Sequence, residues 1–134
     1  MNIKSGVVKD YMARTLVTFK PDTAVLDAVH ILVKNRIAGA PVVDDEGNLI
    51  GMLSELDCMK VALQAGYHGD YGGPVSDYMS KGVKTVSMDM SIIDLAQVFI
   101  DTSYRRFPVT DDNRLVGQIS RRDVLRALEV IATG

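Results

Sequence analysis

GQISRRD, at residues 117–123, has the pattern of an apolar strand that turns into a helix. Gly117 carries no Cβ, so another group can approach the backbone closely there. Ser120 and Asp123 have capping-box spacing before the apolar run that starts at Val124, which predicts Ser120 as a helix N-cap. The bare N–H groups of such an N-terminus suit a phosphate, and Asp123 can accept hydrogen bonds from ribose hydroxyls. Taken alone, most such pairs only cap a helix.

The same spacing returns in GMLSELD at residues 51–57, after an equally apolar lead-in. This match is part of an internal repeat, in which VKDYM at 8–12 matches VSDYM at 75–79 with an offset of 67. The acidic turn is one residue shorter in the second copy, so the offset is 66 from Leu49 and Leu115 onward. We therefore predict two copies of one supersecondary unit.

Each copy has the pattern of a strand, a helix, a two-stranded hairpin and a second helix. In the first copy we expect these elements at residues 16–19, 24–36, 40–43, 49–53 and 54–64. Thr23 is the predicted N-cap of the first helix, and DDEGN at 44–48 is typical of a hairpin turn. The repeats are predicted to span 8–64 and 75–131, joined by a Gly- and Pro-rich linker at 65–74.

Composition places the chain among globular proteins. Of its 134 residues, 47% are hydrophobic and 24% are charged, and the net charge of −2 argues against general nucleic-acid binding. Base stacking on single strands is also disfavoured, because the chain has no Trp and only 6% aromatic residues. We expect a cytoplasmic protein without a membrane span, since there is no long apolar run and the single cysteine, Cys58, has no disulfide partner. Cys58 is expected to be a small buried residue rather than a nucleophile.

No pattern typical of catalysis is present. The sequence has no Ser-His-Asp or Cys-His arrangement, no Gly-rich Lys loop and no carboxylate dyad. No cysteine, second histidine or carboxylate follows His30 at metal-ligand spacing, and His68 is expected to be a solvated loop residue. We therefore predict no enzyme, no catalytic residue and no metal site.

The duplicated β-α-β-β-α unit, with its Pro-Val strand, acidic hairpin and Gly-x-x-Ser-x-x-Asp motif, resembles the tandem cystathionine β-synthase (CBS) domain pair over roughly residues 8–131. The resemblance implies a mixed α/β or α+β fold. In it, two CBS repeats related by a pseudo-two-fold axis pack sheet to sheet, with helices outside, as one Bateman-type module. It also implies adenosyl ligands such as AMP, ADP, ATP or S-adenosylmethionine in clefts between the repeats, and flat dimers formed through helices.

Carried over residue by residue, the resemblance assigns ligand-binding roles in both copies. Asp57 and Asp123 would be the ribose-binding carboxylates, and Ser54 and Ser120 the hydroxyls near ribose or phosphate. Thr18 and Thr85 would border the adenine or ribose. The backbone around Ala40 and Pro41 in the first copy, and around Phe107 and Pro108 in the second, would be the strand that reads the adenine edge.

The two clefts are not expected to be equal, because their charges differ. The second copy carries Arg105, Arg106, Arg121 and Arg122, where the first has Ala38, Gly39, Glu55 and Leu56. The planar fork of arginine holds phosphate oxygens, whereas a glutamate repels them. We therefore expect the phosphorylated ligand in the second copy's cleft, and weak or no binding in the first. At least one or two of the four arginines are expected to face solvent.

These observations predict a regulatory sensor that binds AMP or another adenosyl compound and requires no cofactor. It would signal through a ligand-induced change of a homodimer or through an unidentified regulated protein, which requires unequal binding to two conformations. The alternative is a structural or dimerisation module whose clefts bind no nucleotide in the cell. A thermal-shift screen with adenosyl ligands separates the two, because only a binder is stabilised.

Overall fold

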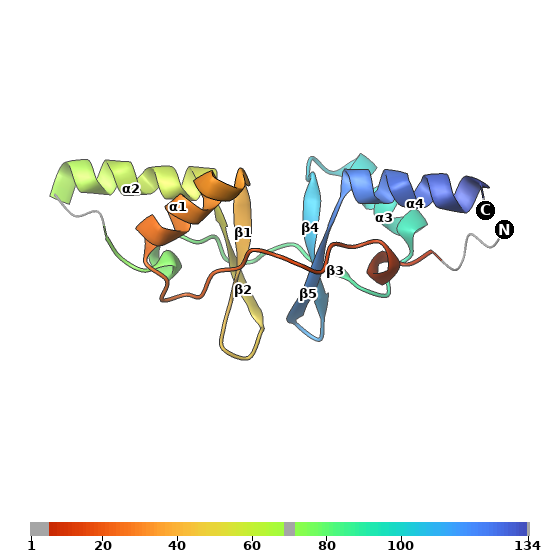
Figure 1. Ribbon diagram of the computed structural model, residues 1–134, viewed down its shortest axis with the longest axis horizontal. Coiled ribbons are helices and arrows are strands. Elements are labelled where there is room, and N and C mark those ends of the chain that lie inside the picture. The colour runs from red at the N-terminus through yellow and green to blue at the C-terminus, as the bar shows by residue number, and fades with distance from the viewer. Residues whose placement is uncertain (1–5, 69–71, 134) are drawn as a thin grey trace. The chain divides into compact units, whose positions relative to one another are not determined.

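The structure, a computed structural model, describes residues 6–68 and 72–133, and the chain in it divides into two units. We call residues 17–83 the central unit, and residues 1–16 together with 84–134 the terminal unit. Each unit contains a β-hairpin and two α-helices (Figure 1). The mixed α+β class expected from the sequence is confirmed.

The central unit is built around one antiparallel hairpin. Its elements are α1 (Val25–Asn35), β1 (Gly39–Val43), β2 (Leu49–Ser54), α2 (Glu55–His68) and the short 3-10 helix η3 (Val75–Asp77). Burial alternates along β2, so that Leu49, Gly51 and Leu53 face inward, as the two-residue period of a strand requires. The two helices lie beside the hairpin (Figure 1), and the core between these elements includes Phe19, Val25, Ala28, Leu32, Val42, Leu53 and Val61.

The terminal unit repeats this plan with one more short strand. Its elements are η2 (Val8–Asp10), β3 (Val86–Ser87), α3 (Ile92–Asp101), β4 (Arg106–Asp111), β5 (Arg114–Ser120) and α4 (Arg121–Thr133). β3 pairs parallel with β4, and β4 pairs antiparallel with β5. Ser91 caps α3, because its hydroxyl accepts a hydrogen bond from the backbone N–H of Ile93 at 3.1 Å. The core includes Val8, Ile92, Leu95, Phe107, Val109, Ile119 and Val124.

The opening segment of each sequence copy belongs to the unit formed by the other copy. The N–H of Val8 donates to the carbonyl of Met90 at 2.9 Å, and Val8 is fully buried in the core of the terminal unit. At the matched position, the N–H of Val75 donates to the carbonyl of Thr23 at 2.8 Å, and Val75 is fully buried in the central unit. The compact units therefore have different boundaries from the sequence repeats.

These exchanged segments end in matched contacts with the middle of a hairpin strand. Ala13 and Gln118 exchange two backbone hydrogen bonds of 2.9 Å in the terminal unit. Met52 and Ser80 exchange the equivalent pair, of 3.0 and 2.8 Å, in the central unit. Ala13 and Ser80 are therefore equivalent in structure as well as in the repeat alignment.

The glycine of each Gly-x-x-Ser-x-x-Asp motif is required by this exchange. A Cβ on Gly117 would lie 2.6 Å from the sulfur of Met12 and 2.7 Å from the carbonyl oxygen of Ala13. A Cβ on Gly51 would lie 2.6 Å from the sulfur of Met79. The close approach predicted at Gly117 is confirmed, and the group that approaches it is the chain's own opening segment.

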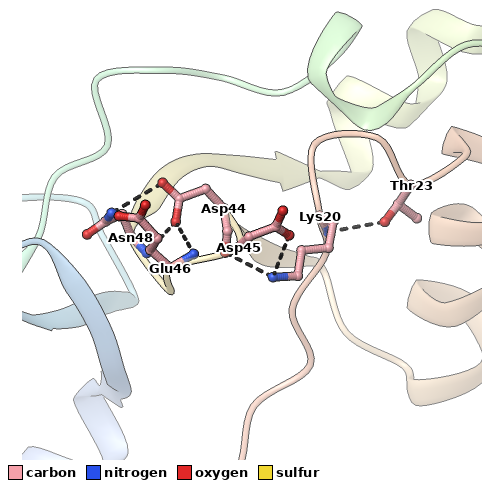
Figure 2. Close-up of polar contacts among 6 residues, drawn as sticks. All are labelled: Lys20, Thr23, Asp44, Asp45, Glu46 and Asn48. Atoms are coloured by element: carbon pink, nitrogen blue, oxygen red, sulfur yellow. Dashed lines mark hydrogen bonds and ion pairs between the residues drawn. The ribbon is translucent and has the colours of Figure 1, made fainter.

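The structure corrects three expectations about the first copy. Residues 16–19 form no strand, and only Phe19 makes an isolated bridge, to Val42. Thr23 is not the N-cap of α1, because Ala24 holds that position without a side-chain bond. The hydroxyl of Thr23 instead accepts the N–H of Lys20 at 3.1 Å (Figure 2). α2 continues to His68, so the first four residues of the predicted linker are helical.

The hairpin turn at residues 44–48 is confirmed and is held by Asp44 (Figure 2). Its carboxylate accepts the backbone N–H groups of Glu46 and Asn48, each at 2.9 Å, and the side-chain amide of Asn48 at 3.2 Å. Lys20 donates to the carbonyl of Asp44 and forms an ion pair with Asp45. The backbone N–H of Asn48 is the main cause that lowers the pKa of Asp44, and the Asn48 side chain, Glu46 and Lys20 act in the same direction.

Candidate functional site

Both predicted strand-to-helix junctions form the reciprocal bonds of a capping box. At the start of α4, the N–H of Ser120 donates to the carboxylate of Asp123 at 2.9 Å, and the N–H of Asp123 donates to the Ser120 hydroxyl at 3.2 Å. At the start of α2, Ser54 and Asp57 make the same two bonds at 2.9 and 3.1 Å. Ser120 is therefore the N-cap that the sequence predicted. The surroundings of the two junctions differ.

The junction of the terminal unit lines a cavity of about 190 Å³. Its walls are formed by Ala13 from the opening segment, Arg106 from β4, Gln118 and Ser120 from β5, and Asp123 from α4. The cavity thus combines a carboxylate, a guanidinium, a hydroxyl and an amide at the N-terminus of a helix. This set of groups can recognise a ligand that carries both hydroxyls and a negative charge.

Asp123 retains hydrogen-bonding capacity at this cavity. Its Oδ2 accepts the N–H of Ser120 and the Ser120 hydroxyl at 2.9 and 3.0 Å, and its Oδ1 forms an ion pair with Arg126. A carboxylate offers about four lone-pair positions, so a position on Oδ1 remains for a donor from a ligand. The Asp123 side chain is 17% exposed, which leaves it within reach from the cavity.

The junction of the central unit is more enclosed. The Asp57 side chain is only 7% exposed, and its carboxylate accepts the Ser54 N–H and forms an ion pair with Lys60 at 3.4 Å. The hydroxyl of Ser80 also lies 3.3 Å from Oδ1 and 3.4 Å from Oδ2 of Asp57. The chain itself therefore supplies a hydroxyl to the carboxylate that the sequence assigned to a ribose.

Of the four arginines predicted near the phosphate, Arg106 alone is among the residues that line this cavity. Arg121 is positioned by a bond from its Nε to the carbonyl of Tyr104 at 3.0 Å. Arg105 and Arg122 are exposed on the surface beside the junction. The contrast in charge with the first copy is concentrated at Arg106, whose counterpart is Gly39.

The residues predicted to border the base lie outside the lining of this cavity. Thr18 and Thr85 are exposed, whereas four of the predicted residues are buried in β1 or β4: Ala40, Pro41, Phe107 and Pro108. The Phe107 ring packs in the core with its centroid 5.1 Å from the centroids of both Phe99 and Tyr104. A role of these residues toward a base therefore stays a prediction.

Ala13 and Gln118 are site residues that the sequence reasoning missed. The repeat alignment paired them with Ser80 and Met52, but it did not show which hairpin each opening segment joins. The Ala13 side chain has no polar group. Its role becomes visible only by comparison with Ser80, which has a hydroxyl at the matched position. Gln118 was visible as the one polar side chain inside an otherwise apolar β5 stretch, LVGQI at residues 115–119.

Cys58 does not contribute a reactive thiolate. Burial raises the pKa of the Cys58 thiol, and the charges of Asp57 and Glu55 act in the same direction. A thiol with a raised pKa is a weak nucleophile at neutral pH. Cys58 is half-buried rather than buried, which corrects the expected burial. Within residues 6–68 and 72–133, no group of three or more His, Cys, Asp or Glu side chains is placed to hold a metal ion. No helix of that same part is long and apolar enough to cross a membrane.

Two separate segments of the chain, residues 8–64 and 75–130, match the model of the CBS domain family. The fold and the duplicated junctions are thus those of a tandem CBS pair, and the chain belongs to the CBS domain family. Among curated relatives, it is 32% identical to CBSX1 and 30% identical to CBSX2, two chloroplastic CBS domain-containing proteins of Arabidopsis thaliana. These alignments cover 92% and 90% of this chain, which spans 65% and 62% of the two relatives.

Solved structures show the same fold. CBSX2 in complex with AMP matches with a TM-score of 0.79 and 30% identity, over 95% of this chain and 98% of that one. The CBS domain pair of protein MJ0100, in complex with 5'-methylthioadenosine and S-adenosyl-L-methionine, matches with a TM-score of 0.70 and 25% identity, over 93% and 97% of the two chains. Adenosyl compounds are thus bound in CBS pairs similar to this one.

Proposed function

We propose that this protein is a regulatory module that binds an adenosyl ligand at the Ser120–Asp123 junction of the terminal unit. The observation that carries the proposal is the cavity that joins Asp123 to Arg106, because it places an available carboxylate and a cation around one space. The AMP and S-adenosylmethionine complexes of similar CBS pairs support the ligand class. AMP fits best, since it has ribose hydroxyls for Asp123 and a phosphate for Arg106.

The size of the cavity limits what it encloses. Pockets that bury a drug-sized ligand typically measure ~300–1,000 Å³, and this cavity measures about 190 Å³. It has room for part of a nucleotide, and the charged and hydroxyl-bearing part matches its walls. The base then contacts residues outside the cavity, for which Thr85, Phe107 and Pro108 remain the proposed set.

The proposed role is regulatory rather than enzymatic. A ligand that binds two conformations of the module unequally shifts their populations, and a partner protein or a sister subunit responds to the shift. A cytoplasmic location stays a prediction, because two relatives are described as chloroplastic.

Isothermal titration with AMP and with adenosine tests the phosphate half of the proposal. Arg106→Ala should weaken AMP about tenfold, or ~1.4 kcal/mol, and leave adenosine unchanged. This is a low value for a charged hydrogen bond because Arg106 is exposed and therefore screened. Arg105→Ala is the matched control, since Arg105 is an exposed neighbour outside the cavity lining. Equal losses in both variants, or no AMP binding by the wild type at millimolar ligand, would reject the proposal.

We also propose a homodimer, because each unit exposes apolar side chains on its helices. In the central unit, Val33 on α1 and Leu56 on α2 are each 72% exposed, and a largely apolar groove of about 590 Å³ lies between the two helices. Exposed apolar patches of this kind mark interaction surfaces. The groove favours dimerisation as part of the function whether or not a nucleotide binds.

Sedimentation analysis tests the dimer. Val33→Glu places a charge in the groove and should shift the protein toward monomer. Lys34→Glu is the control, because the next helical position points about 100° away around the axis. A wild-type protein that is monomeric at all accessible concentrations would contradict the homodimer.

A further inference from the structure

We infer that Ser80 acts as a built-in substitute for a ligand hydroxyl, and that this residue closes the Ser54–Asp57 junction to ribose. The matched position in the terminal unit is Ala13, and the missing hydroxyl there leaves Asp123 free for ligand. The Ser80 hydroxyl oxygen, which Ala13 lacks, thus selects which of the two junctions binds a ribose. This inference rests on the proposed function, since it explains which of two similar sites is used.

The equivalence of the two positions is structural. Ser80 and Ala13 each lie three residues after a short 3-10 helix whose first residue, Val75 or Val8, is buried. Each exchanges two backbone hydrogen bonds with the hairpin strand beside it. Their neighbours on those strands are Met52 and Gln118, which also correspond in the repeat. The backbone therefore delivers residue 80 to Asp57 in the same way as it delivers residue 13 to Asp123.

The Ser80 hydroxyl gives Asp57 a donor from the opening segment of the second copy, and Ala13 gives Asp123 no such donor. Asp57 accepts the Ser54 N–H and the Ser80 hydroxyl on Oδ2, and Lys60 and the same hydroxyl approach Oδ1. The Ser80 hydroxyl has one proton and fills one of about four lone-pair positions of Asp57, but its oxygen lies within 3.4 Å of both carboxylate oxygens. Asp57 is also 5% exposed as a residue, and a ribose would have to displace Ser80 to reach it.

Asp123 also accepts one hydroxyl, but this comes from Ser120 on Oδ2, so that Oδ1 carries only Arg126. Arg126 stands where Lys60 stands in the first copy, and the capping-box bonds have nearly the same lengths. Ala13 lines the cavity beside Asp123 but offers no donor, and the position on Oδ1 stays open. The different charges at Arg106 and Gly39 affect a phosphate, whereas the difference between Ala13 and Ser80 affects the sugar.

Backbone amide NMR with adenosine as the probe tests this inference. Adenosine carries no phosphate, so the contrast between Arg106 and Gly39 does not influence the result. In the wild type, adenosine should shift the Ser120 amide signal and leave that of Ser54 unchanged. Ser80→Ala should add a ligand-dependent shift at Ser54, and Ser80→Thr, which keeps the hydroxyl, should not. Ala13→Ser should weaken the response at Ser120 by about tenfold in ligand concentration, with the amide spectrum confirming that each variant is folded.

The outcomes separate this inference from the proposed function. Wild-type binding at Ser120 that persists unchanged in Ala13→Ser would overturn the inference and leave the proposed function standing. The inference would also be overturned if adenosine caused no shift of the Ser54 amide signal in Ser80→Ala. No response to adenosine or AMP anywhere in the wild type would overturn both.

Discussion

Asp123→Asn removes the charge of the proposed ribose ligand while it changes the shape of the side chain very little. The amide oxygen of Asn can still accept the Ser120 N–H, now 2.9 Å from the carboxylate, so the capping box is largely kept. The ion pair with Arg126 is lost, but Arg126 is 61% exposed, and exposed pairs contribute only ~0–1 kcal/mol to stability. The variant should therefore fold.

The expected loss is in affinity. The structure leaves one open lone-pair position on Asp123 Oδ1. Asp123→Asn therefore removes one charge-assisted hydrogen bond to a ribose hydroxyl. Such a bond is worth ~1.5–3 kcal/mol, which corresponds to roughly 10–150-fold in Kd. Isothermal titration with AMP measures this directly. Asp57→Asn is the matched control and should leave AMP affinity unchanged, because the Asp57 side chain is only 7% exposed and the Ser80 hydroxyl already contacts its carboxylate. Loss of AMP binding in Asp57→Asn, with Asp123→Asn unaffected, would refute the assignment of the sites.

Two further predictions concern stability. The lowered pKa of Asp44 means that its contribution is fully present above its ordinary value of 3.8 and is lost as the pH falls below that value. Thermal melts between pH 5 and 2.5 should therefore show a smaller acid loss of melting temperature for Asp44→Ala than for the wild type, and equal losses would contradict this role. Gly117→Ala should destabilise the protein by ~1–3 kcal/mol, as overpacking does, because its Cβ would lie 2.7 Å from the Ala13 carbonyl oxygen. Urea denaturation checks this value against Leu125→Ala, at a position 63% exposed, and a cost no larger than that control's would show that the opening segment does not need this close approach.

Much of the fold follows from the sequence because the signals are local or duplicated. The hairpins, the helices and the Ser120 N-cap depend on turn chemistry, apolar periodicity and capping-box spacing, all of which act within a few residues. Thr23 shows the limit of such reasoning. Both Thr23 and Ala24 precede a helix, and the Thr23 hydroxyl is used by the turn at Lys20 rather than by α1.

The exchange of the opening segments could not be predicted from the repeat. Val8 and Val75 occupy equivalent sequence positions, so alignment of the copies gives no reason for either to pack on its own or on the other copy's hairpin. For the same reason the sequence identified the arginines as a difference between the sites but gave no role to Ala13 or Ser80. Their relation to Asp123 and Asp57 appears only when the opening segments are placed beside the hairpins.

A crystal structure of the protein grown with AMP tests the central claim most directly. The account predicts a ribose hydroxyl within about 2.6–3.2 Å of the Asp123 carboxylate, the phosphate on the Arg106 side of the cavity, and the Ser80 hydroxyl still bonded to Asp57. A nucleotide whose ribose sits on Asp57 with Ser80 displaced, or one bound away from the Ser120–Asp123 junction, would contradict it.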